Sequence, residues 1–203
     1  VPLYDEGKVI AFYGVDNPPV KSLDYTSNML QIMGYFIVSS IRRRNLVREL
    51  EQMSYSDQLT KLGNRFAMER YVADIPRGAS LGVVYCDITG LKKVNDTLGH
   101  QAGDQLILRA SEVLREEFSD YGIFRIGGDE LLALCADIGE DELKQKAEHM
   151  KTGMKQKDVV MAVGTVWQET WKLGLDILLT ESESWMYQEK AAYYKNTGID
   201  RRH

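Results

Sequence analysis

Residues 125–131 read Arg-Ile-Gly-Gly-Asp-Glu-Leu and lie between two short apolar runs, 123–126 and 131–135. Because glycine tolerates positive φ angles, the Gly127-Gly128 pair predicts a tight hairpin between two strands. A hairpin joins antiparallel strands, whereas the alternation of helices and strands elsewhere in the chain would by itself favour a parallel sheet. The stretch therefore predicts an α+β fold with a mixed central β-sheet flanked by helices.

The segments on either side of this hairpin alternate between strand and helix patterns. The run Leu81 to Cys86 is continuously apolar, which is typical of a strand buried on both faces. Residues 87–101 are polar and contain glycine, so we expect a loop there. Apolar residues at helical spacing predict helices over residues 64–75, 102–118, 140–153 and 175–195, and a further strand is expected over 159–166.

The first 53 residues are organised differently. Residues 1–20 predict a small hairpin, and residues 21–53 predict one long helix with an apolar stripe that includes Leu30, Met33, Ile37 and Ile41. Such a stripe packs against a partner surface or folds back onto its own domain. The most apolar stretch, residues 29–41, has 13 residues and falls short of the roughly 20 needed to cross a bilayer. We therefore expect no membrane segment in this piece of sequence.

Composition and charge narrow the class of protein. The 203 residues suffice for one domain and part of a second, and 44% hydrophobic with 27% charged residues indicates a globular chain. A net charge of −5 disfavours nucleic acid as a partner. Cys86 and Cys135 lie far apart in apolar runs, which favours reduced core thiols and a cytoplasmic location. The chain opens at Val1 without an initiator Met or a basic-then-apolar leader, so we expect a piece of a longer protein.

Three carboxylates follow the predicted strands. Asp87 comes directly after the buried strand, and Asp129 and Glu130 follow two residues that have no side chains, so a phosphate can approach the backbone at Gly128. Carboxylates from neighbouring strands can converge on one point, and hard oxygen ligands suit Mg²⁺ bound together with substrate phosphates. The alternative is that an acidic pair after Gly-Gly is an ordinary exposed turn.

The predicted loop 87–101 and the residues after it offer groups for a nucleotide. Lys92 and Lys93 can neutralise phosphate charge. A carboxylate that accepts from a ring N–H and an exocyclic amine, beside an amide that donates to a carbonyl oxygen, matches the polar edge of guanine and mismatches adenine. Asn95, His100 and Asp104 provide such groups. The alternative is that they only shape the turn and begin the next helix.

Four stretches of the chain resemble, in order and spacing, the GGDEF domain of diguanylate cyclases. They are DQLTKLGNR at 57–65, DITGLKKVNDTLGHQAGD at 87–104, RIGGDEL at 125–131 and MYQEK at 186–190. The resemblance covers residues 54–203 and implies a nucleotidyl cyclase, palm-like fold whose β-hairpin carries the Gly-Gly-Asp-Glu-Leu motif. It also implies an enzyme that joins two GTP into cyclic di-GMP, as each 3′-hydroxyl attacks the α-phosphorus of the other GTP and expels pyrophosphate.

The resemblance assigns roles to individual residues. It implies Mg²⁺ as cofactor, two ions per GTP site with Mn²⁺ as a substitute, held by Asp87, the Ile88 carbonyl, Asp129 and Glu130. Asp129 holds the position of the general base, and Glu130 completes the catalytic acids. The substrate-binding residues would be Lys92, Gly128 and Lys190 for the phosphates and Asn95, His100 and Asp104 for guanine. Because one domain binds one GTP, the product requires a homodimer with facing catalytic domains, joined through the helix at 21–53.

The sequence departs from the family pattern near the predicted site. Leu131 replaces the final Phe of the motif, and Thr89 replaces the second Asp of a D-x-D element. Tyr194 stands where many members carry a phosphate-binding Arg, for which Lys195, Arg201 or Arg202 could substitute. These departures leave open a catalytically silent module that binds GTP or a protein partner.

Two further features bear on regulation. Phe118 and Tyr121 occupy the positions of the R-x-x-D that forms a product-inhibition site in many members, so we expect that site to be absent. Residues 1–20 resemble the trailing strand of a GAF-type sensor domain, on the basis of the segments 7–10 and 14–18. The helix at 21–53 would then transmit a signal to the catalytic domain.

Overall fold

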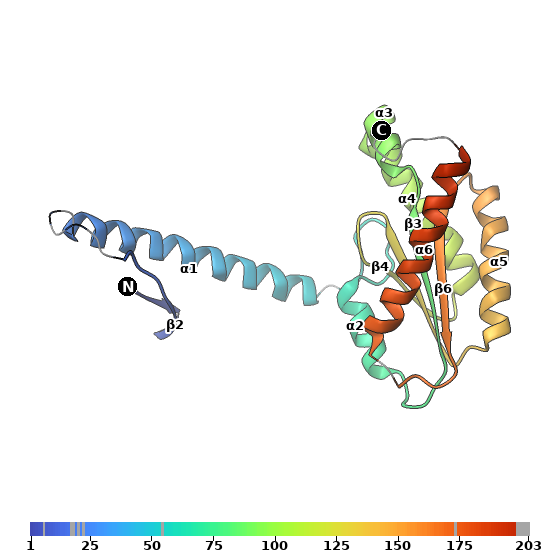
Figure 1. Cartoon of the computed structure of the whole chain (residues 1–203), viewed down its shortest axis with the longest axis horizontal. Coiled ribbons are helices and arrows are strands. Elements are labelled where there is room, and N and C mark those ends of the chain that lie inside the picture. The colour runs from blue at the N-terminus through green and yellow to red at the C-terminus, as the bar shows by residue number, and fades with distance from the viewer. Residues whose placement is uncertain are drawn as a thin grey trace. The chain divides into compact units, whose positions relative to one another are not determined.

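The computed structural model describes residues 1–5, 7–16, 19, 21, 23–53, 55–172 and 174–197. The chain divides into two compact units, Val1–Ser54 and Tyr55–His203 (Figure 1). The candidate functional residues all belong to the second unit, which contains a central sheet and five helices within the described residues.

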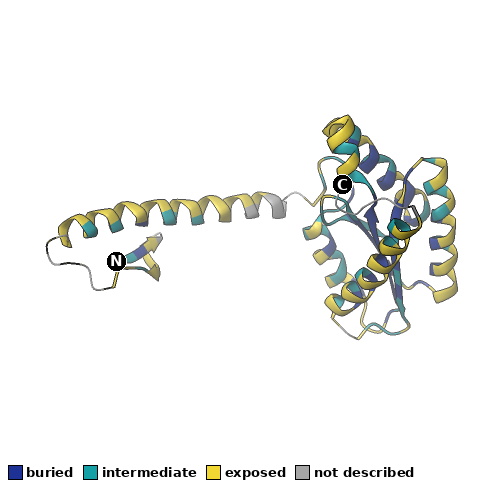
Figure 2. Cartoon of the chain, turned by 45° about the horizontal axis from the view of Figure 1, so that its top comes forward, coloured by how far each residue is buried: buried dark blue, intermediate teal, exposed yellow. Residues whose placement is uncertain are grey.

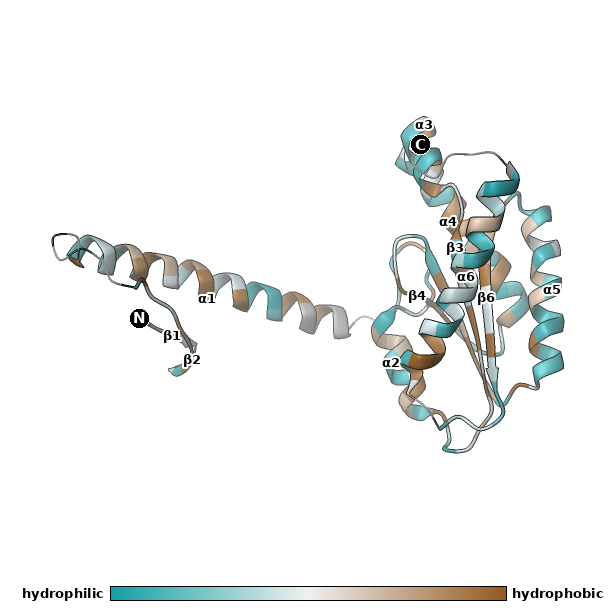
Figure 3. Ribbon diagram, in the orientation of Figure 1, coloured by the Kyte–Doolittle hydropathy of each residue, from teal (hydrophilic) through white to brown (hydrophobic). Residues whose placement is uncertain are grey.

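The first unit consists of the predicted hairpin and long helix. Strands β1 (Pro2–Asp5) and β2 (Lys8–Phe12) pair antiparallel, and α1 spans Leu23–Met53. Many large apolar side chains of α1 are exposed (Figures 2 and 3). Within the described residues no helix has the length and apolar character required to cross a membrane. The resemblance to a GAF domain stays a prediction, and positions 17 and 18, on which it partly rested, lie outside the described residues.

The second unit is built on four strands in the order β4-β5-β3-β6, namely β3 (Leu81–Ile88), β4 (Gly122–Arg125), β5 (Glu130–Ala136) and β6 (Met161–Gln168). The predicted hairpin between β4 and β5 is present, and the α+β class is confirmed. The sheet is antiparallel at each strand pair rather than mixed, although an isolated parallel bridge joins Gly63 to Phe124. Strands β3 and β4 follow one another in the chain, but β5 lies between them in the sheet. Strands β5 and β6 are separated in the same way by β3. Each intervening strand runs antiparallel to both of its neighbours.

Helices cover both faces of this sheet. Helices α4 (His100–Phe118) and α5 (Glu140–Gln156) pack on one face, while α2 (Arg65–Asp74) and α6 (Leu175–Thr197) pack on the other. Strand β3 lies between the two layers, and each of its eight residues is buried, as its continuous apolar sequence predicts (Figure 2). Cys86 and Cys135 are free thiols buried in the core.

A short helix, α3 (Leu91–Leu98), occupies the segment in which the sequence pattern predicted a loop. The prediction of a loop over 87–101 was therefore wrong. Leu91 and Val94 are spaced three residues apart and pack against the core, which gives the segment an amphipathic character despite its polar composition. The segment places two lysines at the start of a helix instead of on an irregular loop.

Helix α6 approaches β6 closely at Gly164. A Cβ atom at this position would lie 1.8 Å from the backbone oxygen of Ser182 and 2.6 Å from the backbone nitrogen of Met186. Only glycine can accept this separation between helix and strand backbones. The absence of a side chain at Gly164 therefore sets the distance between α6 and the sheet, and α6 carries one of the candidate site residues, Lys190.

Candidate functional site

Asp87 lies one residue before the end of β3, on the face of the sheet that α6 covers. Its side chain is only 8% exposed, and its Oδ1 accepts a hydrogen bond from Nζ of Lys190 at 2.6 Å. The ammonium group supplies the compensation that a buried carboxylate needs. Two residues that are 103 positions apart in the sequence, both predicted for the site, are thus brought into direct contact.

The environment of Asp87 disfavours its charged form. Burial raises the pKa of Asp87 above its ordinary value, and the negative charges of Asp129 and Glu130 add to that increase. The hydrogen bond and charge of Lys190 lower the pKa without cancelling the effect of burial. An additional cation near Asp87 would therefore stabilise the ionised carboxylate.

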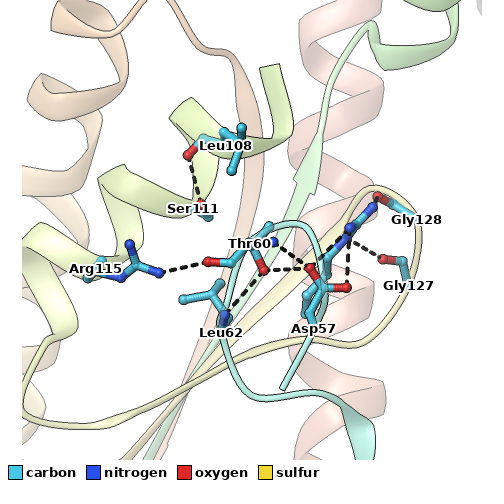
Figure 4. A network of polar contacts seen from close by, with 9 residues as sticks. Asp57, Thr60, Leu62, Leu108, Ser111, Arg115, Gly127 and Gly128 are labelled. Carbon is cyan, nitrogen blue, oxygen red and sulfur yellow. Dashed lines mark hydrogen bonds and ion pairs between the residues drawn. The ribbon is translucent and has the colours of Figure 1, made fainter. Parts of the chain in front are cut away.

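The turn that carries Asp129 is held by the guanidinium group of Arg125, whose bonds end on Gly127, Gly128 and Asp57, the residues labelled in Figure 4. Its Nε donates to the Gly127 carbonyl at 3.2 Å, and its Nη2 donates to the Gly128 carbonyl at 2.8 Å. Its Nη1 meets the two carboxylate oxygens of Asp57 at 3.2 and 3.3 Å. One side chain therefore connects the turn to the segment that precedes α2.

Asp57 is itself fixed by several hydrogen bonds. Its Oδ1 accepts from the backbone N–H and the hydroxyl of Thr60, each at 2.7 Å, and the Thr60 carbonyl accepts from Nη2 of Arg115 on α4 at 2.8 Å (Figure 4). Burial alone raises the pKa of Asp57, but the bonds from Thr60 and the charge of Arg125 outweigh burial and hold it below its ordinary value. Neither Asp57 nor Arg125 was predicted from the sequence as a site residue. The Asp-x-x-Thr spacing, which is typical of a side-chain-capped turn, was the available signal.

A pocket of about 260 Å³ opens beside the end of β3. Its wall includes the residues between β3 and α3, Asp129 on the hairpin turn and part of α6. The residues that line it are Ile88, Thr89, Gly90, Leu91, Lys92, Lys93, Asp129, Lys190, Tyr193 and Tyr194. Three lysines and one carboxylate give the lining a surplus of positive charge, which favours an anionic ligand.

Helix α3 begins at the wall of this pocket. Its N-cap, Gly90, has the left-handed backbone angles φ 82° and ψ 5°, and among the described residues no side chain caps the first turn. The first N–H groups of a helix have no partner within the helix and carry partial positive charge, so they attract phosphate oxygens. The start of α3 thus adds backbone donors to the ammonium groups of Lys92 and Lys93.

The residues predicted to bind guanine lie on α3 and at the start of α4, and they do not line this pocket. Asn95 lies against α4 at Gly103, where a Cβ atom would come within 2.0 Å of its Oδ1. His100 and Asp104 are exposed in the first turns of α4. The structure therefore groups the three residues on one helical hairpin adjacent to the pocket.

The three carboxylates lie at the same end of β3 and β5, but they are not equivalent. Asp129 lines the pocket, and its carbonyl accepts from the Ile88 N–H at 2.9 Å, so the turn and the end of β3 are bonded directly. Glu130 instead accepts a hydrogen bond from the hydroxyl of Tyr85 at 3.0 Å. No three acidic, His or Cys side chains in the described parts of the chain are grouped so that they could hold a metal ion by themselves.

The departures from the expected motif have distinct environments. Leu131 is fully buried in the core on the side of the sheet that α4 covers, which is consistent with an effect on packing. Thr89 is 8% exposed, and its hydroxyl has no hydrogen-bond partner in the described structure. Tyr194 lines the pocket, and Lys195 does not, while residues 201 and 202 lie outside the described residues.

Comparisons with known proteins agree with this arrangement. Residues 54–196 match the family described as "Diguanylate cyclase, GGDEF domain". An uncharacterized membrane protein of Staphylococcus aureus (strain USA300) is 31% identical over 118 residues, which cover 55% of this chain and 33% of that protein. The chain thus spans about a third of the length of this curated relative.

Two solved structures share the fold. The coiled coil and GGDEF domain of DgcB from Caulobacter crescentus, in complex with c-di-GMP, has a TM-score of 0.59 at 17% identity and covers 81% of this chain and 95% of its own. The diguanylate cyclase SiaD of Pseudomonas aeruginosa, in complex with its activator SiaC, has a TM-score of 0.61 at 20% identity, over 85% of this chain and 73% of its own. The family match extends over more than half of the sequence and includes each element of the candidate site. The chain therefore belongs to the GGDEF domain family.

Proposed function

We propose that this protein is a diguanylate cyclase that condenses two GTP into cyclic di-GMP and releases pyrophosphate. The observation that carries the proposal is the pocket at the end of β3, where Lys92, Lys93, the start of α3 and Asp129 lie beside Lys190, whose ammonium group is paired with the buried Asp87. Positive groups suited to a triphosphate thus lie next to carboxylates suited to a divalent cation. Phosphoryl and nucleotidyl transfer depend mainly on this combination of positioning and charge stabilisation.

The residues present fit Mg²⁺. Asp87 is a buried carboxylate whose pKa is raised, so its charged form gains from a nearby cation, and the backbone of Ile88 is bonded to that of Asp129. We propose that Asp87, Asp129, Glu130 and the Ile88 carbonyl hold the ion. When bound, Mg²⁺ would neutralise charge on the phosphates and make the attacking hydroxyl more acidic.

The protein residues would then orient the substrate. Lys92, Lys190 and the first N–H groups of α3 would bind the phosphates, with Gly128 leaving room for them, and Asn95, His100 and Asp104 would hold the guanine base. Asp129 would accept the proton of the 3′-hydroxyl as that oxygen attacks the α-phosphorus of the other GTP. A phosphate in the pocket would compete with Asp87 for the Lys190 ammonium group, which would leave the Asp87 carboxylate available as a metal ligand.

Two catalytic domains must face each other, and α1 offers a surface for a homodimer. Apolar side chains that are 47–70% exposed recur along it at alternating intervals of three and four residues, with Ser39 and Arg43 at the intervening positions. This spacing is typical of a two-stranded coiled coil. The exposed residues are Met29, Ile32, Phe36, Leu46 and Leu50. A cytoplasmic location is part of the proposal, since the buried thiols are free.

The test is incubation of the purified protein with GTP and Mg²⁺, followed by chromatography for cyclic di-GMP and pyrophosphate. Asp129→Asn should abolish product formation without loss of the fold, because the amide cannot accept the hydroxyl proton. Asp120→Asn changes an exposed aspartate just after α4 and serves as the matched control with unchanged turnover. Absence of product from a preparation shown to be dimeric and to bind GTP would contradict the proposal.

That negative result would favour the alternative of a catalytically silent module that binds GTP or a protein partner. Tyr194 supports this alternative, because it lines the pocket where many family members carry a phosphate-binding Arg. Retained turnover of Asp129→Asn would instead refute the role given to that carboxylate.

A further inference from the structure

Tyr85 connects the interior of the sheet to the candidate site. It lies two residues before Asp87 on β3, on the same face of the strand, and is only 6% exposed. Its ring belongs to the core between the sheet, α2 and α6, and its hydroxyl donates to Oε1 of Glu130 at 3.0 Å. A phenylalanine would fill the same volume, so the hydroxyl adds a specific polar contact that the packing does not require.

The second oxygen of Glu130 is also constrained. A Cβ atom at Gly127 would lie 2.1 Å from Oε2 of Glu130, so this carboxylate rests directly over the α-carbon of Gly127. The carboxylate is thus held between the Tyr85 hydroxyl on one side and the hairpin turn on the other. Arg125 holds the same turn through the Gly127 and Gly128 carbonyls.

The register of the sheet explains why Glu130 needs such a restraint. Glu130 is the direct antiparallel partner of Asp87, and side chains at such positions have Cβ atoms about 4.5–5.5 Å apart. Two like charges at this separation repel each other, and Lys190 neutralises only Asp87. A hydrogen bond from Tyr85 fixes Glu130 in one orientation despite that repulsion.

We propose that Tyr85 is a positioning residue of the candidate site, and that its hydroxyl orients Glu130 over the Gly127-Gly128 turn and so fixes the acidic groups that bind the divalent cation. The inference rests on the proposed function, because it concerns metal binding at that site. Tyr85 acts through Glu130 and touches neither the substrate nor the reacting atoms. Removing an outer hydrogen-bond partner of a metal ligand commonly weakens metal affinity by about 10–100-fold.

The test compares Tyr85→Phe with the wild type in direct binding of Mn²⁺, measured by electron paramagnetic resonance. A GTP analogue with a methylene group in place of the α,β-bridging oxygen is present, so no turnover is required. We expect the Mn²⁺ dissociation constant to rise about tenfold in Tyr85→Phe. Tyr121→Phe is the matched control, because it removes a tyrosine hydroxyl that donates to Glu142 at 3.1 Å, at residues that do not line the pocket, and should leave Mn²⁺ binding unchanged.

A double-mutant cycle with Glu130→Ala separates positioning from a general loss of packing. If Tyr85 acts through Glu130, adding Tyr85→Phe to Glu130→Ala should change Mn²⁺ affinity by less than about twofold. Wild-type Mn²⁺ binding by Tyr85→Phe, or an equal loss in both backgrounds, would overturn the inference while leaving the proposed function intact. A wild-type protein that binds neither Mn²⁺ nor the analogue would overturn both.

Discussion

Replacement of Gly164 by alanine should force α6 away from the sheet. The added Cβ would lie 1.8 Å from the Ser182 carbonyl oxygen, whereas ordinary contact begins near 3.4 Å, so the backbones must separate by up to about 1.6 Å. Both atoms belong to backbones, and no side-chain rotation relieves the contact. Overpacking in a rigid core costs about 1–3 kcal/mol, and a backbone clash lies at or above the upper end, so we expect about 3 kcal/mol.

The assay is urea unfolding followed by circular dichroism, together with thermal melting. A loss of about 3 kcal/mol corresponds to a decrease in Tm of roughly 6–12 °C for a protein of this size. Gly153→Ala on helix α5 is the matched control, because the added Cβ would lie at an ordinary contact distance of 3.6 Å from Val113 Cγ1. Alanine is the better helix former there and should add up to about 1 kcal/mol.

The substitution should also affect the site, because α6 carries Lys190, whose Nζ lies 2.6 Å from Asp87. A displacement on the order of 1 Å commonly costs about 100-fold in rate, so turnover of Gly164→Ala at a temperature where it is folded should fall by that order. A Gly164→Ala protein within 1 kcal/mol of the wild type would refute the reasoning about this contact. Unchanged turnover would refute the link from α6 spacing to the site.

Three further predictions concern charges and the product. Asp57→Ala should lower the free energy of unfolding by about 2 kcal/mol, because the largely buried Arg125 loses its partner. Since the pKa of Asp57 is lowered, the stabilisation by its carboxylate is complete at neutral pH and is lost as the pH falls through the folded pKa, below 3.8. Urea unfolding of the wild type and the variant at pH 7 and pH 3 checks this. Asp87→Asn should raise Tm at pH 8, because a raised pKa means that ionised Asp87 lowers the stability of the folded state. This gain in Tm should shrink as the pH falls through the raised pKa toward 3.8. Equal differences in Tm between variant and wild type at pH 8 and pH 4 would contradict the argument. Added cyclic di-GMP should not bind at Phe118 and Tyr121, because Phe118 is fully buried and the Tyr121 hydroxyl is bonded to Glu142. If calorimetry detected binding of cyclic di-GMP that a substitution at Tyr121 abolished, this prediction would be wrong.

Local sequence patterns predicted most of the secondary structure. The buried strand at 81–88 and the long helices follow from hydrophobic periodicity, which acts over a few residues. The hairpin at Gly127-Gly128 is present as well, but neither glycine adopts the positive φ on which its prediction relied. Helix α3 was missed because its polar composition obscured the spacing of Leu91 and Val94. Leu91 and Val94 pack against a core that other parts of the chain provide, so the stability of this short helix depends on the tertiary structure.

By itself, the sequence determined which residues could carry the chemistry of a GGDEF domain: the acidic pair after two glycines, the lysines that follow the buried strand, and Lys190 near the end. Only the tertiary structure decided how they pair. It placed Lys190 on Asp87, anchored the motif turn to Asp57 through Arg125 and turned Glu130 toward Tyr85. These contacts join residues 45–103 positions apart, and their existence depends on strand register and on the close approach of α6 at Gly164, which no local pattern encodes.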